Sequence, residues 1–141
     1  MINQNCYNIF DRTIEQNGLK AMSEKLGKGI ICFSPLAQGM LSDRYLNGIP
    51  EDSRVRTDGR FLQESRLSDE VLDKIRALNE IAQGRGQTLA EMALAWLLKE
   101  EVITSVLAGA SKPSQILDNI KAVENTSFTK DEIETIDRIS K

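Results

Sequence analysis

The residues best suited to chemistry lie near the C-terminal end, within residues 103–119. A short apolar stretch runs into a turn of small residues at 108–111, and Lys112 and Pro113 then open a predicted helix. Where a strand meets a helix N-terminus, unpaired backbone N–H groups and the positive end of the helix dipole coincide. Small residues let an anion approach, and Ser111 and Lys112 add a hydroxyl and a positive charge. The pattern predicts a phosphate site, for which a nucleotide cofactor is the usual ligand. The alternative is structural, because any strand-to-helix connection in a parallel sheet needs small residues and a helix start.

The composition indicates an ordinary globular protein. The chain has 141 residues, 40% of them hydrophobic and 28% charged, which suits one domain spanning residues 1–141. The net charge of −3 and the pI near 5.1 argue against a nucleic-acid-binding surface. No apolar run is long enough to cross a membrane, and the N-terminus lacks the features of a signal peptide. We therefore expect a cytoplasmic protein.

The absence of histidine restricts the chemistry further. With no histidine in the sequence, a Ser-His-Asp or Cys-His nucleophilic site and a histidine metal ligand are excluded within this chain. Cys6 and Cys32 are far apart and belong to no CxxC pair. We expect both to be buried free thiols, and nothing in the sequence supports a bound metal.

The hydrophobic pattern predicts an α/β fold with three strands, at residues 2–7, 29–33 and 103–107. The second is an apolar run that suits a strand covered on both faces. A single helix with an apolar stripe (Ile14, Leu19, Met22 and Leu26) is expected between the first two strands. Four more helices are expected. Ser68 caps the first, Thr88 opens a buried second helix that holds Trp96, and Thr129 opens the last. The third covers residues 113–123, with Ile116, Leu117, Ile120 and Val123 pointing inward. Alternating strands and helices predict a parallel sheet.

Residues 36–66 lack periodicity and are rich in glycine and arginine. A region of this length without regular structure is uncommon in a compact domain, and it is usually a lid or a binding loop. The alternative is a solvated excursion.

Three phrases carry a resemblance to a known family. FSPLAQGML, RYLNGIPEDSR and SVLAGASKPSQILDNI occur in this order, and the resemblance that they carry covers essentially the whole chain. In this the chain resembles the aldo/keto reductases, in the branch of the potassium-channel β-subunits and the bacterial L-glyceraldehyde-3-phosphate reductases. The resemblance implies a (β/α)8 TIM barrel, which usually needs about 250 residues. The chain matches its C-terminal part, the last three strand–helix units, plus a C-terminal helix.

The resemblance also implies a set of NADPH contacts. Gln4 would lie near the nicotinamide amide, with Tyr7 and Phe33 beside the ring. The pyrophosphate would lie along Ser34, Leu36, Gln38 and Gly39, with Arg44 and Arg54 over it. Beyond the turn at Gly109, the 2′-phosphate would lie at Ser111, Lys112 and Gln115, and the adenine at Asp118 and Asn119. For Arg54 and Asp118, a solvated surface pair is the alternative. Two charge-assisted hydrogen bonds to the 2′-phosphate favour NADP over NAD.

An intact relative would be an NADPH-dependent reductase of small aldehydes, phosphorylated ones included. The family's catalytic Asp, Tyr, Lys and His have no match in this chain, so we expect the chain alone to be inactive. The alternatives are a non-catalytic nucleotide-binding module that acts in regulation, as channel β-subunits do, and an inactive truncated product. A partial barrel exposes a strand edge and apolar surface, so we also expect self-association. The sequence does not identify the substrate.

Overall fold

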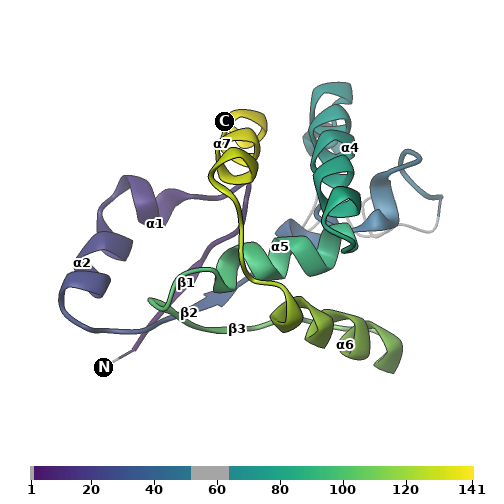
Figure 1. Cartoon of the computed structure of the whole chain (residues 1–141). Coiled ribbons are helices and arrows are strands. Elements are labelled where there is room, and N and C mark those ends of the chain that lie inside the picture. The colour runs from purple at the N-terminus through teal and green to yellow at the C-terminus, as the bar shows by residue number, and fades with distance from the viewer. Residues whose placement is uncertain (1, 52–63) are drawn as a thin grey trace.

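Three parallel strands form the centre of the molecule. The computed structural model describes residues 2–51 and 64–141. The strands are β1 (Asn3–Cys6), β2 (Ile30–Phe33) and β3 (Ile103–Val106), paired in the order β1-β2-β3. The predicted parallel sheet is confirmed, and Figure 1 shows the strands side by side, below α4 and α7.

Helices connect the strands and follow the last of them. The α-helices are α1 (Thr13–Gln16), α2 (Leu19–Lys25), α4 (Asp69–Gly84), α5 (Leu89–Leu98), α6 (Pro113–Ile120) and α7 (Lys130–Ser140). Short 3-10 turns lie at η1 (Ala37–Gly39), η2 (Asp43–Tyr45), η3 (Glu64–Arg66) and η4 (Lys121–Glu124). The three predicted N-caps are confirmed, because the hydroxyls of Ser68, Thr88 and Thr129 each accept a bond from the first turn of a helix. Among the described residues, no helix could span a lipid bilayer.

Helix α5 forms the core, as its nearly continuous apolar sequence predicts. Leu89 and residues 91–97 are all buried, and Trp96 has no exposed surface. The helix packs against β3 on one side and against α4 on the other, and α7 in turn contacts α4 (Figure 1). Its N-terminus is fixed by a reciprocal capping box between Thr88 and Glu91. The sheet therefore has one well-covered face.

The prediction of a single helix between β1 and β2 is wrong. Gly18 adopts a left-handed conformation with φ of 79° and separates α1 from α2. A residue with positive φ breaks the helical path, so the apolar stripe does not stay on one face. Ile14 remains buried, whereas Met22 and Leu26 are 54% and 59% exposed. Ser23 is the buried residue of α2 instead.

The other face of the sheet is open. Along β2, Ile30 and Cys32 have no exposed surface, but Phe33 is 39% exposed. The expectation that this strand is covered on both faces is therefore wrong for the described part of the chain. Both cysteines are free thiols, as predicted, but the predicted burial is confirmed only for Cys32, because Cys6 is half-buried. Burial raises the pKa of the Cys32 thiol to about 11.

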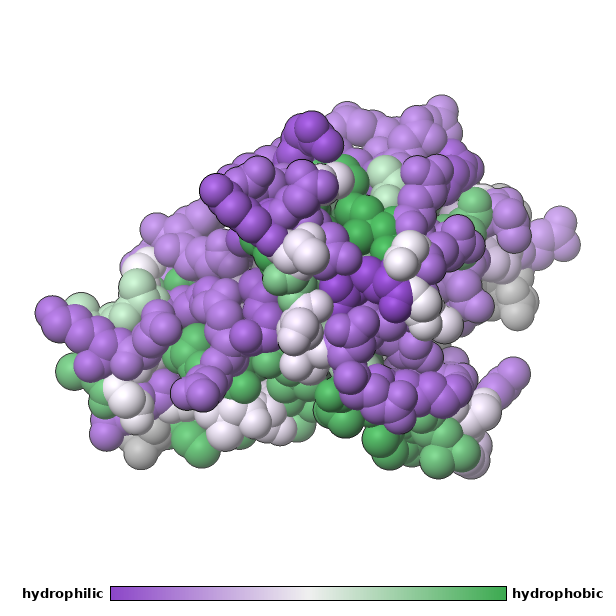
Figure 2. Space-filling model, viewed as in Figure 1, coloured by the Kyte–Doolittle hydropathy of each residue, from purple (hydrophilic) through white to green (hydrophobic). Residues whose placement is uncertain are grey.

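Helix α6 exposes the apolar face that was expected to point inward. The predicted stripe of large apolar side chains, which lies on α6 and on η4 after it, is more than half exposed at every position: Ile116, Leu117, Ile120 and Val123. Figure 2 shows hydrophobic side chains gathered along the lower edge of the molecule, where Figure 1 places α6. The helical period was predicted correctly, but the described residues contain no element that covers this face.

Candidate functional site

The turns that leave the three strands meet at one edge of the sheet. Because the strands are parallel, their carboxyl ends share this edge. The first residue of each turn continues the pairing: the Tyr7 amide donates to the Phe33 carbonyl at 3.4 Å, and the Leu107 amide to the Cys32 carbonyl at 2.8 Å. In open parallel sheets and in barrels, this edge is where ligands bind. The turns supply most of the predicted contact residues.

Gln4 and Phe33 lie on the open face of the sheet. Gln4 is paired with Ile31, and Phe33 lies two residues further along β2, so side-chain alternation puts all three on one face. Gln4 is exposed and Phe33 is 39% exposed. The open face thus presents a carboxamide and, near its carboxyl edge, a flat aromatic ring.

The prediction that Tyr7 lies beside a cofactor ring is wrong. Tyr7 has no exposed surface; its ring centroid lies 5.2 Å from that of Trp96, and its hydroxyl donates to Glu15. Burial, together with this hydrogen bond, raises the pKa of Tyr7 above its ordinary value. The physical reason is alternation: a spacing of three from Gln4 sends Tyr7 to the helix-covered face.

The loop after β2 has an unusual backbone. Three residues other than glycine have positive φ: 53° at Ser34, 48° at Ala37 and 59° at Gln38; Gly39 follows at 93°. Such conformations are uncommon and gather at functional sites. Successive turns of this kind form a concavity of N–H groups that suits an anion.

Not every amide of this loop is available to a ligand. The Ala37 amide donates to the Ser34 carbonyl at 3.0 Å, and the Gly39 amide to the Leu36 carbonyl at 2.9 Å. Among the hydrogen bonds of the described residues, the amides of Leu36 and Gln38 have no acceptor. The half-buried Leu36 side chain packs against the buried cluster of Leu94, Ala95 and Ala122.

Of the two predicted arginines, the structure describes one. Arg44 is exposed in η2, where its amide donates to the Ser42 hydroxyl at 3.4 Å. Arg54 lies outside the described residues. The prediction for Arg54 therefore stays a prediction.

The turn after β3 directs three donors at a single oxygen. The Gln115 carboxamide oxygen accepts from the Ser111 amide at 2.8 Å, the Ser111 hydroxyl at 3.1 Å and the Lys112 amide at 3.2 Å. This convergence at the N-terminus of α6 is the arrangement that a phosphate oxygen requires. The neutral amide oxygen of Gln115 stands where an anionic oxygen fits, so the residues present suit a phosphate group.

The surroundings of this turn leave room for a ligand. Ser111, Lys112 and Gln115 are exposed, and Lys112 forms no ion pair with any residue that the structure describes. A Cβ atom added to Gly109 would meet nothing within 4 Å. The chain itself therefore does not fill the space around this corner.

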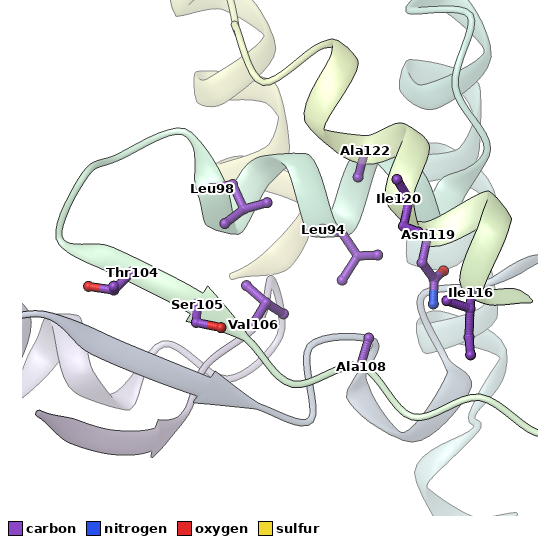
Figure 3. A pocket seen from close by; sticks show the side chains of 10 residues that line it. All are labelled: Leu94, Leu98, Thr104, Ser105, Val106, Ala108, Ile116, Asn119, Ile120 and Ala122. Atoms are coloured by element: carbon purple, nitrogen blue, oxygen red, sulfur yellow. The ribbon is translucent and has the colours of Figure 1, made fainter.

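The two residues predicted to face adenine differ from each other. Asp118 forms an ion pair with Lys121 at 2.9 Å, with both side chains more than half exposed. This is the surface pair that was the alternative interpretation. Asn119 is half-buried and lines a cavity of about 380 Å³ between β3, α5 and α6, into which it points together with Ile116 (Figure 3). Ser111 and Lys112 do not line this cavity, so the structure does not place all the predicted residues in one pocket.

Sequence reasoning missed Asn8. Its side chain is 3% exposed and bonds to both the turn after β1 and the loop after β2. An asparagine directly after a strand, followed by an aspartate three residues on, is typical of an Asx turn and could have been noticed. In the described part of the chain, no group of three or more Cys, Asp or Glu side chains could hold a metal ion.

Comparison with known proteins decides the family. The model of the aldo/keto reductase family matches residues 1–141. The chain belongs to the aldo/keto reductase family. This aldo/keto reductase chain is 46% identical over 141 residues to the L-glyceraldehyde 3-phosphate reductase of Escherichia coli O157:H7, covering 98% of the chain and 41% of the relative. It is 38% identical over 121 residues to a putative voltage-gated potassium channel subunit beta of Schizosaccharomyces pombe, covering 84% of this chain and 35% of the relative.

A solved structure agrees with this assignment. The aldo-keto reductase from Bacillus halodurans in its holo form superposes with a TM-score of 0.73 at 28% identity, covering the whole of this chain and 43% of that one. The aldo/keto reductase structures of this comparison are TIM barrels, of which this chain covers about 40%. The predicted family and the predicted partial barrel are confirmed. The chain spans about two fifths of the length of the relatives that it matches.

Proposed function

We propose that this chain is the NADPH-binding part of a cytoplasmic aldo/keto reductase that reduces small aldehydes, phosphorylated ones among them. The observation that carries the proposal is the convergence of the Ser111 and Lys112 donors on one oxygen position at the start of α6. The 46% identity to a reductase named for L-glyceraldehyde 3-phosphate supports the substrate class. Residues 1–141 would act as a single domain.

Each part of the carboxyl edge then has a role. Gln4 holds the nicotinamide amide, and the exposed ring of Phe33 supports the flat nicotinamide from the open face. The left-handed loop offers the amides of Leu36 and Gln38 to the pyrophosphate. Lys112 and Ser111 receive the 2′-phosphate, for which Gln115 must swing aside. When bound, NADPH supplies the hydride that reduces an aldehyde.

The chain alone is proposed to be inactive. The resemblance implies that the family's catalytic Asp, Tyr, Lys and His match no position here, and this supports the proposal. The sequence has no histidine to stabilise or donate to a developing alkoxide. A longer protein that carries these four residues would reduce aldehydes. A regulatory nucleotide-binding module is the second candidate, favoured by the likeness to the putative channel subunit. Aldehyde reduction by the longer protein would decide between them.

Replacing Lys112 with alanine tests the phosphate assignment. A charge-assisted hydrogen bond contributes about 1.5–3 kcal/mol, which corresponds to roughly 10- to 150-fold in affinity. We expect Lys112→Ala to weaken NADPH binding by about that factor and to leave NADH binding unchanged, as measured by fluorescence titration of the whole chain. The control is Lys130→Ala, because the Lys130 side chain is 91% exposed on α7, away from the turn. If Lys112→Ala lowered the affinity for both nucleotides equally, or for neither, the proposal would be contradicted.

The uncovered surface is proposed to drive self-association. Among the described residues, β1 and β3 are the edge strands of the sheet and have one partner each, and α6 exposes Ile116 and Ile120 beside the cavity at β3 (Figure 3). Unpaired strand edges and apolar patches of this kind promote association. We expect dimers or larger species in light scattering, and a shift toward monomer in Ile120→Glu. Leu26→Glu is the control: Leu26 is equally exposed, at 59%, but it is the C-cap of α2 and lies outside the α6 surface, so this variant should associate as the wild type does. A compact monomeric wild type would refute this proposal.

A further inference from the structure

We propose that Asn8 is a positioning residue that sets the shape of the dinucleotide loop after β2. The inference rests on the proposed function, because it concerns the same loop. Asn8 is 3% exposed and therefore cannot itself touch a ligand. It acts through its hydrogen bonds to the turns that leave β1 and β2.

The Asn8 carboxamide uses both of its ends. The Oδ1 atom accepts from the Phe10 amide at 2.9 Å and from the Asp11 amide at 2.8 Å, which fixes the turn after β1. The Nδ2 atom donates to the Ser34 carbonyl at 3.0 Å, across 26 positions in sequence. Asn8 also closes its own turn, because its amide donates to the Asp11 carbonyl at 3.1 Å. One buried side chain thus joins two of the three turns at the carboxyl edge.

The Ser34 carbonyl is a critical point of the loop. It accepts from Asn8 Nδ2 and also from the Ala37 amide at 3.0 Å, so it defines the first bend. Ser34 is held at φ of 53°, a conformation that a side chain disfavours and that the surrounding structure must maintain. The free amides of Leu36 and Gln38 follow directly from this bend. If the bond from Asn8 to Ser34 is lost, we expect the bend that carries these amides to change its shape.

The carboxamide chemistry makes the assignment specific. Aspartate has nearly the same shape and keeps the acceptor for Phe10 and Asp11, but it has no N–H to donate. In Asn8→Asp a carboxylate oxygen would therefore face the Ser34 carbonyl oxygen, and the two would repel. Asn8→Asp removes the two bonds that Nδ2 donates, the one to the Ser34 carbonyl between the two turns and a long one to Cys6 Sγ at 4.0 Å. Asn8→Ala removes all of the bonds that the side chain makes.

Amide hydrogen exchange on the whole chain tests the positioning role without any ligand. We expect the Ala37 amide to exchange at least tenfold faster in Asn8→Asp, with the amides of α4 and α5 unchanged. Asn17→Asp is the matched control, because Asn17 makes one local turn bond, to the Leu19 amide at 3.0 Å, on the exposed surface. Unchanged exchange at Ala37 in Asn8→Asp would overturn the inference. If Asn8→Asp does not fold, the same exchange experiment compares the double variant Asn8→Asp/Ser34→Gly with Ser34→Gly alone. Glycine at position 34 relieves the disfavoured φ.

Nucleotide titration then links the bend to binding. We expect Asn8→Asp to weaken the binding of NADPH and of NADH by the same factor, about tenfold. The preference for NADP should be kept, because the Ser111 and Lys112 donors are unchanged. A changed preference, or affinity equal to that of the wild type, would contradict the link. If the wild type binds neither nucleotide, the proposed function fails, while the exchange at Ala37 still decides whether Asn8 positions the loop.

Discussion

Trp96→Ala is expected to unfold most of the chain at room temperature. Trp96 is the largest side chain without exposed surface, at the centre of α5. Truncating a buried tryptophan costs about 3–5 kcal/mol, against a total stability of about 5–15 kcal/mol for an average domain. We expect a partial barrel with an open sheet face to lie at the low end of that range, so the loss should approach the whole free energy of unfolding.

The contacts of Trp96 raise the cost further. Its ring meets the Tyr7 ring at 5.2 Å, the Arg12 guanidinium at 5.0 Å and the Lys99 ammonium at 3.9 Å. Cations over a desolvated indole contribute about 1–2 kcal/mol each. Burial lowers the pKa of Lys99, and the neighbouring Glu100 opposes this change, so the charge depends on these contacts.

Urea unfolding followed by circular dichroism measures the effect. Trp96→Phe is the control: it keeps an aromatic ring, and the indole N–H that it removes has no hydrogen-bond partner among the described residues. We expect the phenylalanine variant to lose about half as much free energy of unfolding as the alanine variant. An alanine variant within about 1 kcal/mol of the wild type would show that Trp96 does not hold this core together.

Arg12→Ala should cause the second largest loss of stability, about 2–4 kcal/mol of the free energy of unfolding. The Arg12 side chain is only 16% exposed and forms ion pairs with Glu15, at 2.8 Å, and with Asp137 on α7. Removing one partner of a largely buried pair leaves the other charges desolvated, which costs more than the pair itself contributes. The bond to Asp137 joins the turn after β1 to the last helix, 125 positions away.

The effect of Arg12→Ala should also be local to α7. We expect faster hydrogen exchange across α7 than across α4 in this variant, because α7 loses its tie to the start of the chain. The matched control is Arg76→Ala, which removes another arginine paired three residues away, with Asp73 at 2.7 Å, but with side chains 48% and 75% exposed. That exposed pair should contribute less than about 1 kcal/mol. Equal destabilisation by the two variants would contradict the role of Arg12.

Local sequence signals predicted the well-formed elements. Two capping boxes, Thr88 with Glu91 and Thr129 with Glu132, each lie within one turn. Four consecutive residues are therefore enough to predict where each of these helices begins. The buried α5 follows from its lack of a polar face. Gly18 interrupts a stripe that otherwise looks continuous, and the Asn17-Gly18 pair, a common turn signal, could have predicted that break.

Features that depend on distant partners could not be predicted. The stripe on α6 indicates burial, but its partner is absent from the described residues. The role of Asn8 depends on its hydrogen bond to Ser34, and the role of Arg12 depends on its bond to Asp137. Neither pairing has a local signal in the sequence. The Tyr7 error was avoidable, because strand alternation alone assigns it to the face opposite Gln4.

The central claim is that the turns after β2 and β3 together bind NADPH, and amide chemical shifts of the isotope-labelled chain test it most directly. On titration with NADPH, the account predicts shifts confined to residues 34–39 and 109–115, with NADH causing smaller changes around Ser111 and Lys112. No change in these two segments at millimolar NADPH, or changes centred on α4 and α7, would contradict the account.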